Sequence, residues 1–156
     1  YAYIGSKSDL ASAIEAVVRH TIDDVMTDLE SHNLDPQHRL KALIHADLYM
    51  NDIMHQWYYF CFIEAKGLDK EQREEAMLME FRFDERLKNI FAEGISNGVF
   101  SYDGNTSLLA AATTAQLQQW YLKRWKFQQL GTDINGYADF ILQNLLTTLN
   151  SKSTQQ

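Results

Sequence analysis

The segment that decides the fold is Ile53-Met54-His55-Gln56-Trp57-Tyr58-Tyr59-Phe60-Cys61-Phe62-Ile63. All of its residues except His55 and Gln56 are apolar or aromatic. It is too short to cross a membrane as a helix, which needs about 20 residues. It also lacks the two-residue alternation of a half-buried strand, and polar, helix-like segments flank it. We therefore expect a central helix, buried on most of its circumference, with the other helices packed around it.

Two further helices are expected before this segment. Ser6 is a good N-cap, and apolar residues recur at helical spacing from Leu10 to Leu29, so the first helix should cover residues 6–31. Asp35 and Pro36 suit the cap and first position of the second helix. Its buried stripe should consist of Leu40, Leu43, Ile44 and Leu48.

Three more helices are expected after it. Asp69 and Gln72 resemble a capping box, and the helix that they open should end at Asn97-Gly98. A loop follows, then a helix over residues 107–129 and a last helix capped by Asp133. The sequence predicts an all-α fold, a bundle of about six helices over residues 6–150, with a frayed tail at 151–156.

The composition restricts the class of protein. A chain of 156 residues with 46% hydrophobic and 22% charged residues is expected to form one globular domain. A net charge of −7 argues against this segment wrapping nucleic acid by itself. The single cysteine, Cys61, allows no disulfide within the chain, which favours a reducing compartment. Without a visible signal peptide or membrane span, we expect a cytoplasmic protein.

The sequence offers little for catalysis or for a cofactor. There is no Gly-x-Ser-x-Gly or glycine-rich phosphate loop, and the acids Glu71, Glu74 and Glu75 fit a solvated helical face. Candidate metal ligands are His45, Asp47 and His55, and the pair His20 and Asp24. No cluster with ligand spacing supports a metal site. We expect no enzyme, no cofactor and no metal.

The aromatic segment has two readings, plain core or the wall of a ligand pocket. Bulky rings in sequence pack imperfectly and can surround a cavity, and methionine adapts to several apolar shapes. Glu64 could meet a polar group of the ligand, although a surface acid is the simpler reading. The candidate ligand-binding residues are Met54, Trp57, Tyr58 and Phe62, with Met77 and Phe81 facing them and Trp120 closing one side.

The last two helices carry more small and apolar surface than one intrachain contact needs. Residues 110–115 are small, and the helix from Ile134 to Leu149 has a wide apolar face. This surface could serve simple packing within the chain, or a two-fold dimer in which both helices meet their copies. The dimer reading places Ala112, Gln116, Phe140, Ile141, Leu145 and Leu149 in the interface.

Four motifs, in order, match a known pattern. They are Tyr1-x-Tyr3-Ile4-x-Ser6-Lys7-x-Asp9-Leu10, Glu93-Gly94-Ile95-Ser96-Asn97-Gly98-Val99-Phe100, Trp120-Tyr121-x-x-x-Trp125 and Tyr137-Ala138-Asp139. This layout resembles the tetracycline-repressor (TetR) family of bacterial transcriptional regulators. In that family the first motif joins the recognition helix of a helix-turn-helix to the ligand-binding domain.

The resemblance implies a truncated regulator, a repressor that forms a homodimer through its last two helices. Residues 1–5 would end the recognition helix, and Tyr1, Tyr3 and Lys7 would contact DNA phosphates. Operator DNA would bind through the missing N-terminal helices, and a small apolar or amphipathic effector would bind among the central helices. The alternatives are a helical small-molecule-binding protein or enzyme with no DNA role, and a bundle with a filled core that acts only through protein contacts.

Overall fold

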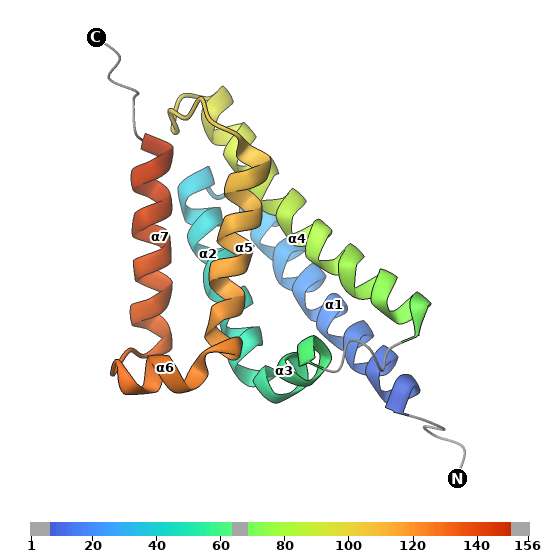
Figure 1. Cartoon of the computed structure of the whole chain (residues 1–156). Coiled ribbons are helices and arrows are strands. Elements are labelled where there is room, and N and C mark those ends of the chain that lie inside the picture. The colour runs from blue at the N-terminus through green and yellow to red at the C-terminus, as the bar shows by residue number, and fades with distance from the viewer. Residues whose placement is uncertain (1–6, 64–68, 151–156) are drawn as a thin grey trace.

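Seven α-helices form the structure, a computed structural model that describes residues 7–63 and 69–150 (Figure 1). The described residues contain no strand, which confirms the predicted all-α fold. One more helix occurs than expected because the helix predicted over residues 107–129 breaks at Lys123. The helices are α1 (Lys7–Ser31), α2 (Pro36–Ile53), α3 (His55–Ile63), α4 (Lys70–Ser96), α5 (Thr106–Leu122), α6 (Arg124–Gln129) and α7 (Ile134–Asn150).

Side-chain caps begin three of the long helices. The Asp35 carboxylate accepts a hydrogen bond from the backbone N–H of His38 at 2.8 Å, ahead of Pro36 at the start of α2. Asp69 and Gln72 form the predicted capping box at the start of α4. Asn105 caps α5, which therefore begins a residue earlier than expected. These contacts satisfy N–H groups that the first helical turn leaves without a partner.

The centre of the bundle is α2. Its predicted stripe of four aliphatic residues is 0–1% exposed, and α2 contacts α1, α3, α4, α5 and α7. The same core includes Leu87 and Phe91 from α4, Leu117 from α5 and Ile141 from α7. Burial of these side chains supplies most of the driving force for folding, since each fully buried large aliphatic side chain contributes about 1.5–3 kcal/mol.

The prediction that the aromatic segment is the central helix was wrong. The chain turns at Met54, and α3 lies at the lower end of the bundle, where its main contacts are with α2 and α5 (Figure 1). Ile53, Tyr59 and Ile63 are 72%, 48% and 56% exposed. A helix that is apolar on all sides needs neighbours on all sides, and here only part of its surface is covered.

The turn between α4 and α5 folds back on α4. The Phe100 N–H donates to the Gly94 carbonyl at 2.8 Å, and the Phe100 ring is buried. A Cβ atom on residue 94 would lie 2.1 Å from that ring, so only glycine fits there. Gly98 has a φ of +82°, which glycine adopts without strain.

A half-buried carboxylate joins the C-terminal end of α2 to α5 and α6. Asp52 accepts hydrogen bonds from Trp120 Nε1 at 3.0 Å and from Arg124 Nη1 at 2.5 Å. The Trp120 ring stacks on Phe127 and Tyr137, with centroid distances of 5.3 and 5.5 Å. The break at Lys123 thus brings α6 under the bundle and turns the chain toward α7.

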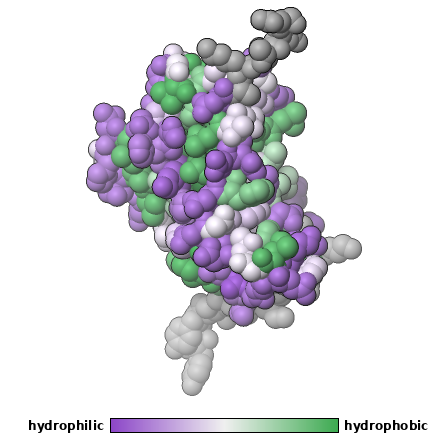
Figure 2. Space-filling model, turned by 90° about the vertical axis from the view of Figure 1, so that its left-hand side faces the viewer, coloured by the Kyte–Doolittle hydropathy of each residue, from purple (hydrophilic) through white to green (hydrophobic). Residues whose placement is uncertain are grey.

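The surface over α7 has hydrophobic residues interspersed among hydrophilic ones (Figure 2). Within the ranges that the structure describes, no helix has the length and apolar character needed to cross a membrane.

Candidate functional site

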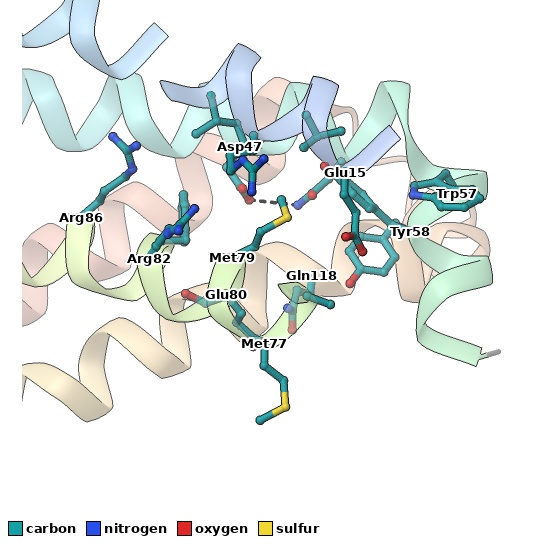
Figure 3. A pocket seen from close by; sticks show the side chains of 18 of the residues that line it. Glu15, Asp47, Trp57, Tyr58, Met77, Met79, Glu80, Arg82, Arg86 and Gln118 are labelled. Atoms are coloured by element: carbon teal, nitrogen blue, oxygen red, sulfur yellow. Dashed lines mark hydrogen bonds between the residues drawn. The ribbon is translucent and has the colours of Figure 1, made fainter. Parts of the chain in front are cut away.

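A cavity of about 550 Å³ lies between α1, α2, α3, α4 and α5. Its volume falls within the roughly 300–1,000 Å³ usual for small-molecule sites. Side chains from all five helices line it, with α1 and α4 contributing the most (Figure 3). The lining residues are Glu15, Val18, Arg19, Ile22, Asp23, Asp47, Asn51, Trp57, Tyr58, Arg73, Ala76, Met77, Met79, Glu80, Arg82, Phe83, Arg86, Thr114, Gln118 and Tyr121.

Most of the lining surface is apolar, and aromatic rings gather at one end of the cavity. Trp57 and Tyr58 come from α3, and the ring of Tyr58 lies 5.5 Å from that of Tyr121 on α5. Figure 3 shows Asp47 between this end and the end that carries Arg82 and Arg86. The cavity therefore combines an aromatic wall with polar groups farther along it.

Asp47 is the lining carboxyl that α2 contributes. It accepts a hydrogen bond from Asn51 Nδ2 at 3.0 Å, and the same amide lies 3.3 Å from the Leu117 carbonyl oxygen. Burial disfavours the charged form and raises the pKa of Asp47 to about 7, against a partial opposing effect of the Asn51 hydrogen bond. At neutral pH this carboxyl is therefore partly protonated.

Glu15 is a second lining carboxyl with a raised pKa, on α1. Burial and then the neighbouring carboxylate of Glu75 raise its pKa to about 7, and the charge of Arg19 acts in the opposite direction. Glu75 had been predicted to lie on a solvated face of α4, but it is half-buried and faces Glu15 instead. Arg73, on the same helix, is exposed and lines the cavity.

Three of the predicted ligand-binding residues, Trp57, Tyr58 and Met77, line the cavity. Met54 does not, and lies instead at a separate hollow formed by residues 53–57. Phe81 is 60% exposed outside the lining, while Trp120 is 6% exposed in the core. The structure thus brings together three of these residues, whose binding role stays a prediction.

Several other predicted sites fall outside the described residues. Tyr1, Tyr3 and Glu64 lie there entirely, and the side chains of Lys7, Cys61 and Phe62 are also outside the description.

The predicted dimer residues divide into two groups. Ala112 and Gln116 on α5 and Phe140 on α7 are exposed, with Phe140 at 59%. Ile141, Leu145 and Leu149 instead point into the subunit, where they are at most 5% exposed. They occupy the stripe of α7 that packs on α2, so a partner could not reach them without opening the core.

Within residues 7–63 and 69–150, the histidines do not form a metal site with the acids around them. His45 Nε2 lies 3.9 Å from Asp139, and His55 Nδ1 lies 2.7 Å from the Asp52 carbonyl. Among the described residues no group of three or more His, Cys, Asp or Glu could hold a metal ion.

Sequence reasoning missed Glu15 and Asp47 as lining residues. A signal for Asp47 was present, because it occupies the same helical stripe as Ile44, Leu48 and Asn51. A carboxylate within a buried stripe is rare unless it has a partner or a function.

Comparison with known proteins identifies one related family. A family model for the tetracyclin repressor-like C-terminal domain matches residues 33–132, well over half of the chain. Neither the comparison with curated proteins nor that with solved structures gave a match. The match covers α2 to α6, the helices that contain much of the core and of the cavity. The chain therefore belongs to the tetracycline-repressor-like family, of which it carries the C-terminal domain.

Proposed function

We propose that this chain is the effector-binding and dimerisation part of a one-component repressor that acts in the cytoplasm. A small apolar or amphipathic effector occupies the cavity and lowers the affinity of the regulator for operator DNA. The observation that carries the proposal is the cavity itself, of about 550 Å³ and largely apolar, in a domain of a family of ligand-responsive regulators.

The first helix is the element through which binding would be transmitted. Five residues of α1, from Glu15 to Asp23, line the cavity, so an effector contacts α1 directly. By the family resemblance, the DNA-reading head precedes this helix. An effector that fits one position of α1 better than another then shifts the position of the heads. A tenfold loss of operator affinity requires about 1.4 kcal/mol of coupling, which is within the common range for allostery.

The experiment uses the full-length gene product and DNA selected from a randomised duplex pool. Apolar and amphipathic compounds that raise its melting temperature are identified first, together with any ligand that co-purifies in native mass spectrometry. Fluorescence anisotropy then measures operator affinity with and without each compound. We expect at least one of them to weaken operator binding by about tenfold or more.

A matched pair of variants separates cavity binding from other effects. Ala76 lines the cavity and Ala92 is exposed on the same helix, α4, outside it. Ala76→Phe fills the cavity, so operator binding should persist while the response to ligand is lost, and Ala92→Phe should respond like the wild type. If no stabilising ligand changes operator affinity, the mechanism is wrong. If no DNA is selected at all, the alternative of a small-molecule-binding protein or enzyme without a DNA role is favoured.

A further inference from the structure

The cavity is lined by equal numbers of acidic and basic side chains, but they differ in whether a ligand could form an ion pair with them. The charged lining residues are Glu15, Arg19 and Asp23 from α1, Asp47 from α2, and Arg73, Glu80, Arg82 and Arg86 from α4. The lining residues of α3 and α5 are uncharged. The lining thus contains four acids and four arginines, and a ligand can pair only with those that have no partner already.

Most of these charges are either paired or exposed to water. Arg86 forms an ion pair with Asp23. Glu15 interacts with the Glu75 carboxyl, and the charge of Arg19 also acts on it. Arg73, Glu80 and Arg82 are exposed, so solvent and salt screen their interactions with a ligand. The inner part of the cavity is left with the carboxyl of Asp47.

Asp47 has a hydrogen-bond donor, Asn51, but no cationic partner. Over residues 7–63 and 69–150, no lysine, arginine or histidine nitrogen lies within ion-pair distance of its carboxylate. A carboxylate in such surroundings is costly unless a positive charge accompanies it. The raised pKa of Asp47 reflects this cost.

We infer that the cavity selects amphipathic organic cations, whose ammonium or amidinium group pairs with Asp47 while the apolar body lies toward Tyr58 and Tyr121. The aromatic faces suit both an apolar body and a cation, since a ring attracts positive charge within about 6 Å of its centroid. This inference deepens the proposed function and rests on its claim that the cavity holds the effector.

An anionic ligand fits the same cavity less well. Its charge would lie near Asp47 and Glu15. Of the lining arginines, Arg86 is in an ion pair with Asp23, and Arg73 and Arg82 are exposed. The charge of the half-buried Arg19 already acts on Glu15. A neutral ligand would leave Asp47 protonated and would gain no ion pair.

The test compares three ten-carbon probes of similar shape, decylamine, decanol and decanoate, by isothermal titration calorimetry on the full chain at pH 7. We expect decylamine to bind most tightly. Because Asp47 is partly protonated at this pH, decylamine should also release protons, measured as a binding enthalpy that depends on the ionisation enthalpy of the buffer. Decanol should show no such dependence.

Two neutralising variants assign the effect to one carboxyl. Asp47→Asn retains an acceptor for Asn51 but removes the charge, and should weaken decylamine by at least about tenfold, as the loss of a charged hydrogen bond does. Decanol affinity should not change. Asp24→Asn makes the same substitution at an exposed position of α1 outside the lining and should alter decylamine affinity less than twofold.

The inference is overturned if decanoate or decanol binds as tightly as decylamine, if Asp47→Asn binds decylamine as the wild type does, or if decylamine does not bind. These outcomes do not concern DNA, so the regulator proposal is judged separately. A ligand such as decanol that weakens operator binding while decylamine fails would overturn the cation inference alone. Decylamine bound through Asp47, with operator affinity unchanged by every ligand, would overturn the regulator proposal alone.

Discussion

At the scale of single residues, the Asp47 carboxyl links the cavity to the stability of the fold. Its pKa rises from 3.8 to about 7 on folding, so the native state holds the proton more tightly than the unfolded chain does. The stability that protonation contributes is therefore fully present below pH 3.8 and is lost as the pH rises through about 7. A ligand cation would relieve the same cost at neutral pH.

We expect Asp47→Asn to reduce the loss of stability between pH 5 and pH 8. The variant has no carboxyl to ionise, and the penalty avoided is on the order of a few kcal/mol, since a tenfold change in acidity corresponds to about 1.4 kcal/mol. Melting temperatures at both pH values measure the effect. Glu15 still ionises in the variant, so part of the decrease in stability with rising pH should remain. Equal slopes for the variant and the wild type would show that Asp47 ionises normally.

A second prediction at this scale concerns Gly94. Because a Cβ atom there would lie 2.1 Å from the buried Phe100 ring, Gly94→Ala should destabilise the protein despite the better helix propensity of alanine. We expect a loss of up to about 2 kcal/mol, which is the upper end of typical overpacking, about 3 kcal/mol, less the gain in propensity of about 1 kcal/mol. Urea unfolding gives the value, with the exposed Ser96→Ala as control. If the clash with the ring is the cause, adding Phe100→Leu to Gly94→Ala should restore part of the lost stability. If it restores none, the loss has another cause.

At the scale of helices, the sequence predicted where helices begin better than where they lie in the bundle. Helix starts at Asp35 and Asp69 could be read from the sequence, because a cap and its N–H groups lie within four residues. The position of α3 could not, since a segment that is apolar on every side has no preferred face. The turn at Met54 and the break at Lys123 are marked by neither glycine nor proline in the sequence.

The lining of the cavity was also predicted only in part from the sequence. Trp57, Tyr58 and Met77 were expected in a pocket from their bulk and flexibility, and they line one. The acids and arginines of α1 and α4 were not expected there, because helical surface charges usually face water. Only the crossing of these helices over α2 decides which of them face inward.

The contact that fixes the junction of α2, α5 and α6 can be tested directly. Asp52→Ala removes the acceptor for both the buried Trp120 and Arg124, leaving the indole N–H without its partner. We expect a loss of about 2–3 kcal/mol in the free energy of unfolding, the usual cost of losing hydrogen bonds to a charged group. Asp24→Ala, at an exposed position of α1, should change stability by less than about 0.5 kcal/mol. Similar losses in the two variants would mean that the junction contributes little.

At the scale of the whole molecule, the cavity and the proposed dimer surface occupy different parts of the bundle. The cavity lies among α1 to α5, whereas the outer surfaces of α5 and α7 carry Ala112, Gln116 and Phe140. The proposed dimer would use these exposed residues, while Ile141, Leu145 and Leu149 maintain the fold of each subunit. The central helix α2 contacts elements on both sides.

We expect Phe140→Asp to weaken the dimer and to leave the subunit folded. Phe140 is 59% exposed, so its replacement opens no core, whereas a central aromatic residue at an interface contributes about 2 kcal/mol or more. That corresponds to at least about a thirtyfold higher dissociation constant. Sedimentation equilibrium measures it, and circular dichroism checks the fold. Phe81→Asp changes the same residue type at 60% exposure on α4 and should not alter the association. Should both variants dimerise like the wild type, the interface lies elsewhere.

The three tryptophans allow ligand binding to be followed by intrinsic fluorescence. Trp125 is 56% exposed, Trp120 is 6% exposed in the core, and Trp57 lines the cavity. A dissolved quencher such as iodide should dim mainly the outermost indole, whereas a compound entering the cavity should shift the emission of Trp57. Trp125→Phe would remove the solvent-exposed background without touching the interior. Occupancy could then be followed in an unlabelled sample, in the same cuvette in which operator is titrated.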